Sequence, residues 1–110
     1  ATVQSAAQYV QNKGGIVCVS AGNDAATVSA PDNPYVLCVS ATNESDSPTS
    51  FTNKGGNVDV AAPGINILTT NSGGGYGYWW GTSFSAPVAA GVAALALSAN
   101  PNLSGEQLMS

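Results

Sequence analysis

The chain has 110 residues, of which 44% are hydrophobic and only 7% are charged, and its formal net charge at pH 7 is −4. This length and hydrophobic content suit one globular unit with its own core and argue against disorder. Lys13 and Lys54 are the only cations, so no basic patch is available to neutralise phosphates, and we expect no nucleic-acid partner.

The first part of the chain predicts a helix followed by two strands. Apolar residues recur at helical spacing between residues 3 and 10, and Gly14 can end that helix in a left-handed conformation. Residues 16–20 and 36–40 are short β-branched runs, typical of strands buried on both faces of a parallel sheet. The intervening segment 22–35 is rich in Gly, Asn, Asp and Pro and predicts a loop.

The middle of the chain carries weaker strand signals. Residues 58–61 and 65–70 are candidate strands, and Pro63-Gly64 between them predicts a turn. Residues 71–77 predict a loop or a hairpin, because three consecutive glycines give this segment conformational freedom.

Residues 83–98 predict a helix that is small or apolar on nearly every side. A helix without a polar face is expected inside a larger domain. Its apolar run, about 84 to 97, is shorter than the roughly 20 residues that span a bilayer, so we expect no membrane partner. Residues 104–107 have the spacing of a capping box that begins another helix. A central helix with so few covering elements indicates a piece of a larger α/β domain.

Residues 81–87 (GTSFSAP) place one serine hydroxyl, that of Ser83, at the start of the predicted helix. The helix dipole there favours negative charge, and unpaired backbone N–H groups are available. The alternative interpretation is that Ser83 or Thr82 is only an N-cap. The hydrolase pattern G-x-S-x-G fails, because Ser85 occupies its final glycine position. A nucleophilic serine also needs a general base, and the chain contains no histidine.

Residues 81–95 (GTSFSAPVAAGVAAL) resemble the nucleophile segment of the subtilisin-like serine proteases. Three further segments are similar to the same family in the same order: 16–24, which ends in A-G-N-D, 58–64 (VDVAAPG), and 100–103. The resemblance covers nearly the whole chain. It implies an α/β fold, namely a partial subtilisin-like three-layer domain with a parallel sheet and a buried central helix. Residues 1–110 would be the C-terminal portion of the catalytic domain, with the Asp and His segments of the triad upstream.

The resemblance also implies catalytic roles. Ser83 falls on the nucleophile, and Asn23 falls on the oxyanion-hole position, where its side-chain amide would act beside the Ser83 N–H. Without the resemblance, Asn23 would be interpreted as a turn residue after a strand. Asp24 follows it and would either touch substrate or be a solvated loop charge. No aspartate stands in the family's triad context, and Lys54 lies in a predicted exposed turn, residues 53–56, that does not suit a substitute base.

Substrate-binding roles follow from the same resemblance. Ser20, Ala21 and Gly22 would form one wall of the pocket for the substrate residue that precedes the scissile bond. Trp79, with Trp80, would lie on the leaving-group side. The alternative for these aromatic residues is packing within the core or a hairpin.

Cys18 and Cys38 occupy matching positions of two similar pentapeptides, 17–21 and 37–41. Free buried thiols are the first interpretation, and a cross-strand disulfide is the second, because neighbouring strands bring Cα atoms within bridging range. The chain suggests no metal site or cofactor of its own, although the complete domain could hold a structural calcium ion. Sparse charge with abundant Asn and Ser suits a secreted, extracellular protein.

The resulting hypothesis is a serine endopeptidase that acts through an acyl-enzyme on Ser83 and is incomplete in this chain. Its partners would be a peptide or protein substrate and the missing N-terminal part of the same domain. The alternative is a non-catalytic subtilase-like fragment or pseudoenzyme with a binding or structural role. A nucleotide-binding domain is disfavoured, because the glycines at 73–75 lack both the G-x-G-x-x-G spacing and a P-loop Gly-Lys-Ser/Thr.

Overall fold

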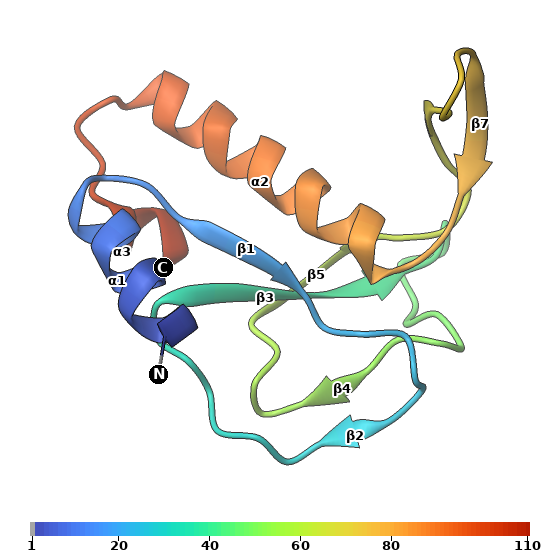
Figure 1. Cartoon of the computed structure of the whole chain (residues 1–110), viewed down its shortest axis with the longest axis horizontal. Coiled ribbons are helices and arrows are strands. Elements are labelled where there is room, and N and C mark those ends of the chain that lie inside the picture. Colours follow the sequence, from blue (N-terminus) through green and yellow to red (C-terminus); the bar gives the residue numbers. More distant parts are fainter. Residues whose placement is uncertain (1) are drawn as a thin grey trace.

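A computed structural model describes residues 2–110 of the chain. Its main element is a three-stranded parallel sheet. The strand order is β1 (Val17–Ser20), β3 (Val36–Thr42), β5 (Val60–Pro63), with β3 in the centre. Figure 1 shows the ends of β1 and β3 near the start of the long helix α2 (Thr82–Ala99). The parallel sheet and its helices confirm the predicted α/β class.

The core lies between the sheet and α2. Leu37 and Val39 of β3, Ala62 of β5 and Ala86 of α2 form its buried apolar cluster. The first four residues of β3 are all buried, so this strand is covered on both faces, as its β-branched run predicts.

The two cysteines do not occupy matching positions of the sheet. Cys18 lies opposite Leu37, whereas Cys38 lies opposite Val19. Because side chains alternate along a strand, this offset of one residue directs the two thiols to opposite faces. Both cysteines are free and no disulfide joins them. Cys38 is buried, as the first interpretation expects, whereas Cys18 is only half-buried.

Strand β5 extends beyond its predicted end. It begins at Val60 rather than at residue 58 and includes Pro63, which the sequence pattern assigned to a turn. Pro63 lies opposite Thr42 at the end of a strand at the sheet edge, where the missing N–H of proline costs no central ladder bond.

The remaining strands form two small pairs. β6 (Ile67–Thr70) and β7 (Tyr76–Trp79) make an antiparallel hairpin that projects from the body of the molecule in Figure 1. This result selects the hairpin from the two predicted alternatives. β2 (Thr27–Val28) and β4 (Lys54–Gly55) form a short parallel pair inside segments predicted as loop and turn.

Two shorter helices lie side by side near the start of β1 (Figure 1). They are α1 (Thr2–Asn12) and α3 (Gly105–Met109). The Gln11 side chain of α1 contacts the Met109 sulfur at 3.2 Å. The predicted capping box is present: the Ser104 side chain accepts from the Gln107 N–H, and the Gln107 side chain accepts from the Ser104 N–H.

Helix α2 has two unlike sides. Ala86, Val88 and Ala89 pack on the sheet, whereas Val92 and Leu95 are 63% and 72% exposed. The helix is longer than the predicted apolar run, and by length and composition alone it could cross a membrane. Its packing on β1, β3 and β5 fits the core helix of an α/β domain, and residues 2–110 cover only its sheet-facing side.

We expect the isolated chain to self-associate through this uncovered side of α2, because contiguous exposed apolar surface drives association. Replacing Val92 and Leu95 together by glutamine should weaken the association, since both side chains are exposed and glutamine is a good helix former. Sedimentation velocity and the fluorescence of a hydrophobic dye measure the effect. A stable wild-type monomer that binds no dye would contradict the expectation.

Candidate active site

Asn23 lies in the loop after β1, and its side chain is bound to the start of α2. The Asn23 Oδ1 accepts hydrogen bonds from the Thr82 backbone N–H at 2.8 Å and from the Thr82 hydroxyl at 2.9 Å. The same hydroxyl accepts from the Gly22 N–H at 3.1 Å. These bonds bring together two segments that are about sixty residues apart in sequence, at the carboxyl end of a parallel strand, where open α/β sheets place their ligands.

The hydrogen bonds also fix which end of the Asn23 amide is free. Of the two ends of the amide, only Oδ1 can accept a hydrogen bond, so the Oδ1 atom must face the Thr82 N–H. The Nδ2 group, with its two protons, therefore points away from Thr82. Asn23 is exposed, so this group can donate to a molecule outside the protein.

Ser83 follows Thr82 directly and is exposed. The helix begins at Thr82 with Gly81 as N-cap, and the first free N–H of the helix, that of Thr82, is bound by the Asn23 side chain instead. Neither Ser83 nor Thr82 is the N-cap, so the structure excludes the alternative interpretation. In the first turn the Ser83 N–H belongs to the donors that have no partner within the helix, and the helix dipole adds positive potential there.

The backbone contact between Gly81 and Gly64 supports the start of α2, and both positions require glycine. Gly81 has a φ of 132°, and a Cβ on it would lie 3.4 Å from the Asn23 Nδ2. Its N–H donates to the Gly64 carbonyl at 2.8 Å. A Cβ on Gly64 would overlap the Ser85 hydroxyl and the Ala41 methyl. The strand end at Pro63-Gly64 thereby holds the Gly81 backbone.

The predicted substrate wall, residues 20–22, lies at the end of β1 and is hydrogen-bonded to β3. Ser20 is exposed at the end of β1, and Ala21 and Gly22 are half-buried. The Ala21 N–H donates to the Val39 carbonyl at 2.9 Å, which continues the sheet ladder. This segment therefore runs from the sheet directly into Asn23.

Trp79 lies at the end of β7 and is 47% exposed. Its ring stacks on Phe84, with ring centroids 6.2 Å apart, and its indole N–H donates to the Asn71 Oδ1 at 2.8 Å. Phe84 is the next residue after Ser83. The neighbouring Trp80 packs on Phe51, with ring centroids 4.9 Å apart. Trp79 thus packs next to the Ser83 segment while half of its surface stays open.

The groups with shifted pKa values, Cys18, Cys38 and Asp59, lie on or beside the strands of the sheet and not at Asn23 or Ser83. The Asp59 carboxylate accepts from the Cys38 N–H at 2.8 Å. Burial and the neighbouring Asp32 raise the pKa of Asp59, while that hydrogen bond lowers it. Burial raises the pKa of both thiols, Cys18 and Cys38. The Asp59 carboxylate is therefore bound to β3.

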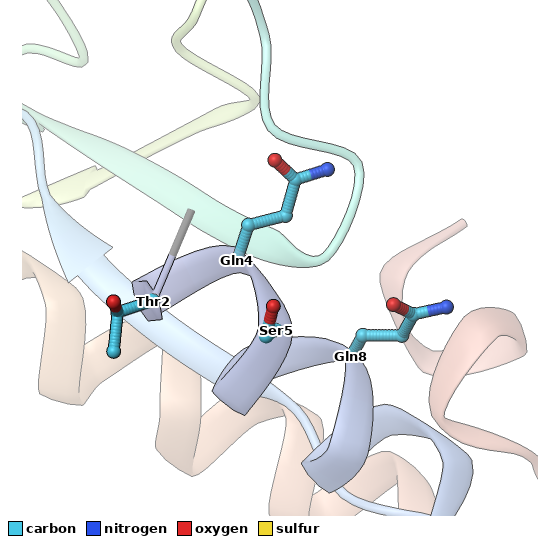
Figure 2. Close-up of a pocket in the computed structure, with 4 residues that line it drawn as sticks. All are labelled: Thr2, Gln4, Ser5 and Gln8. Atoms are coloured by element: carbon cyan, nitrogen blue, oxygen red, sulfur yellow. The ribbon is translucent and has the colours of Figure 1, made fainter.

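Two hollows in the described part of the chain lie away from Asn23 and Ser83. Figure 2 shows one of them, lined by the polar α1 residues Thr2, Gln4, Ser5 and Gln8. It contains no side chain that titrates near neutral pH. The other is an apolar groove between α2, β5 and α3. Within residues 2–110, no group of three or more His, Cys, Asp or Glu side chains is arranged to hold a metal ion.

Two residues of this site were not assigned a role from the sequence. Thr82 is fully buried, and both its N–H and its hydroxyl hold Asn23. Asn53 is buried as well, although the segment 53–56 predicted an exposed turn. Lys54 beside it is exposed, as predicted. No local pattern distinguishes a buried asparagine from a turn asparagine, because the difference depends on partners distant in sequence.

Comparison with known proteins gives matches along the chain. Residues 1–110 match the family model described as the subtilase family. The chain is 40% identical over 103 residues to the thermophilic serine proteinase of Bacillus sp. (strain AK1), and the match covers 92% of this chain and 26% of that protein. It is 43% identical over 97 residues to the halolysin-like extracellular serine protease Nep of Natrialba magadii, with 86% of this chain and 18% of that protein covered.

Further matches agree. The chain is 39% identical over 103 residues to subtilisin E of Bacillus subtilis (strain 168), with 88% of this chain and 27% of that protein covered. Among solved structures, a cold-adapted subtilisin-like serine proteinase is similar with a TM-score of 0.85 and 38% identity, over 99% of this chain and 41% of that one. A protease from Pseudoalteromonas arctica PAMC 21717 is similar with a TM-score of 0.88 and 31% identity, over 99% of this chain and 38% of that one.

The chain spans about a quarter or less of the length of these three curated relatives. The match to the family model nevertheless extends from the first residue to the last, and the sheet and helices are arranged as in subtilisin-like structures. The chain belongs to the subtilase family.

Proposed function

We propose that this chain forms part of a serine endopeptidase, in which Ser83 is the nucleophile and Asn23 is an oxyanion-hole donor. The observation that carries the proposal is the pair of hydrogen bonds from Thr82 to the Asn23 Oδ1. They leave the Asn23 amide protons free, next to the first turn that holds the Ser83 hydroxyl. Family membership supports the same reaction class.

The proposed reaction begins when the Ser83 Oγ attacks the carbonyl carbon of a peptide bond and transfers its proton to a base. The carbonyl oxygen becomes an oxyanion, and the Asn23 Nδ2–H and the Ser83 N–H donate to it. Collapse of this intermediate breaks the C–N bond, and the protonated base gives its proton to the leaving amine. Water then hydrolyses the acyl-enzyme and regenerates Ser83.

The general base must come from outside these residues, since the chain contains no histidine. In a triad the base is a histidine oriented by an aspartate. We propose that both belong to a preceding part of the same catalytic domain, of which residues 1–110 form the C-terminal portion. The uncovered side of α2 is consistent with further packing partners.

Substrate contacts are proposed for the segments that flank the two catalytic residues. Ser20, Ala21 and Gly22 would form one wall beside the residue preceding the scissile bond, and Trp79 would cover the leaving-group side with its exposed half. The substrate is a peptide or protein. Secretion is proposed from the sparse surface charge and from one relative that is itself described as extracellular. A structural calcium ion is proposed only for the complete domain.

We expect residues 1–110 alone to show no Ser83-dependent hydrolysis of a peptide ester or amide, because the base is missing. The full-length protein should hydrolyse both substrates and should be inactivated by a serine-directed reagent. The measurement compares the purified, mass-verified chain with the full-length protein. Turnover by the chain alone at the full-length rate, abolished in Ser83→Ala, would contradict the external base. An inactive full-length protein would favour the non-catalytic alternative.

A further inference from the structure

The Asn53 side chain is 6% exposed and faces the loop that carries Asn23. Its Oδ1 accepts from the backbone N–H groups of Asp24 at 3.0 Å and Ala26 at 3.1 Å. Its Nδ2 donates to the Ala21 carbonyl at 3.1 Å and contacts the Asp24 carboxylate at 3.5 Å. The two backbone donors fix the orientation of this amide as well, because they require an oxygen acceptor.

The main chain of Asn53 adds a contact to the same loop. Its N–H donates to the Gly22 carbonyl at 2.9 Å. Asn53 therefore binds the loop both before Asn23, at residues 21 and 22, and after it, at residues 24 and 26. A Cβ on Gly22 would lie 2.5 Å from the Asn53 Nδ2, so the packing here leaves no room for a side chain.

The loop needs such support because part of its backbone is strained. Gly22 has a φ of 105°, and Ala25 has a φ of 52°. A non-glycine residue in the left-handed region persists only where its surroundings hold it. The bonds from Asn53 to Asp24 and Ala26 enclose Ala25, and the Ala25 N–H donates to the Phe51 carbonyl at 2.9 Å.

We propose that Asn53 is a positioning residue for oxyanion stabilisation: it fixes the backbone of residues 21–26 so that the Asn23 amide stays aimed beside Ser83. The proposal rests on the function proposed for Asn23. Asn53 contacts the backbone on both sides of Asn23, and it acts on the reaction only through the placement of that residue.

The test is a double-mutant cycle in the full-length protein, with kcat and KM measured on a peptide amide. Asn53→Ala should lower kcat about 10- to 100-fold with little change in KM, because a misplacement of about 1 Å can cost about 10²-fold. In an Asn23→Ala background the same change should cost less than about threefold, since the residue it positions is gone.

Thr52→Val is the matched control for a merely structural role. Thr52 is buried beside Asn53. Its hydroxyl accepts from the Ala41 N–H of β3 at 2.9 Å and donates to the Asn53 main-chain carbonyl at 3.3 Å, and neither bond reaches residues 21–26. Thr52→Val should lower the urea midpoint of unfolding and leave kcat unchanged. Hydrogen exchange of the Asp24 and Ala26 amides should accelerate in Asn53→Ala but not in Thr52→Val.

The outcomes separate this proposal from the proposed function. If Asn23→Ala leaves kcat unchanged, the proposed role of Asn23 fails. If Asn23→Ala lowers kcat but Asn53→Ala does not, or the two losses multiply in the double variant, the positioning role alone is overturned. Should Asn53→Ala not fold, Asn53→Asp replaces it in the cycle. Asn53→Asp keeps an acceptor for Asp24 and Ala26 and loses the donor to Ala21, so the same non-additive loss is expected.

Discussion

Replacing Ser83 by alanine in the full-length protein should lower kcat by about 10⁶-fold, a magnitude established on subtilisin and carried over from it. The reason is that the acyl-enzyme can no longer form. KM should change little, because Ser83 is exposed and its side chain has no partner among the protein hydrogen bonds described for residues 2–110. Initial rates on a peptide amide, with active-site concentration known, measure the loss.

Ser85→Ala is the matched control for Ser83→Ala. Ser85 lies in the same helix and is fully buried, and its hydroxyl has no hydrogen-bond partner in the structure. Removing a buried, unsatisfied hydroxyl is neutral or stabilising, so Ser85→Ala should keep kcat and should not lower the urea midpoint. If Ser85→Ala lost most of its kcat while Ser83→Ala stayed active, Ser85 and not Ser83 would be the nucleophile.

Replacing Asn23 by alanine should lower kcat by about 10²- to 10³-fold, again a magnitude established on subtilisin. The lost group is the Nδ2 donor, whose contribution grows as charge develops on the carbonyl oxygen, so kcat should fall much more than KM rises. The matched variant is Asn23→Asp. It keeps the acceptor that Thr82 requires but replaces the donor by a carboxylate oxygen.

We expect Asn23→Asp to be at least as inactive as Asn23→Ala while its urea midpoint remains closer to the wild-type value. Full activity of Asn23→Asp would mean that the donor has no role and that Asn23 only holds the start of α2. The comparison therefore separates a catalytic amide from a structural one.

The elements of this fold could be predicted where a local pattern carries the information. The apolar runs at 16–20 and 36–40 predicted the strands β1 and β3. The expected burial on both faces holds for the central strand β3, whereas β1 lies at the sheet edge, is half-buried and ends at the exposed Ser20. The apolar run after Gly81 predicted α2, and the Ser104–Gln107 spacing predicted the start of α3. The proposed roles of Ser83 and Asn23, in contrast, came from resemblance to a family.

Other features could not be predicted because they depend on contacts distant in sequence. The similar pentapeptides suggested that Cys18 and Cys38 would align, but the register of β1 on β3 is offset by one residue. Asn53 resembled a turn asparagine, yet the loop after β1 surrounds it. Thr82 suggested at most an N-cap, and its importance appears only when Asn23 lies against it.

Covalent labelling of the full-length protein with a fluorophosphonate tests the central claim most directly. The activated serine Oγ bonds to phosphorus and displaces fluoride, and peptide mapping by mass spectrometry identifies the modified residue. We predict one adduct per molecule, located on Ser83, formed in parallel with the loss of activity, absent in Ser83→Ala and slowed in Asn23→Ala. An adduct on another serine that accounts for the loss of activity, with Ser83 unmodified, would contradict the account.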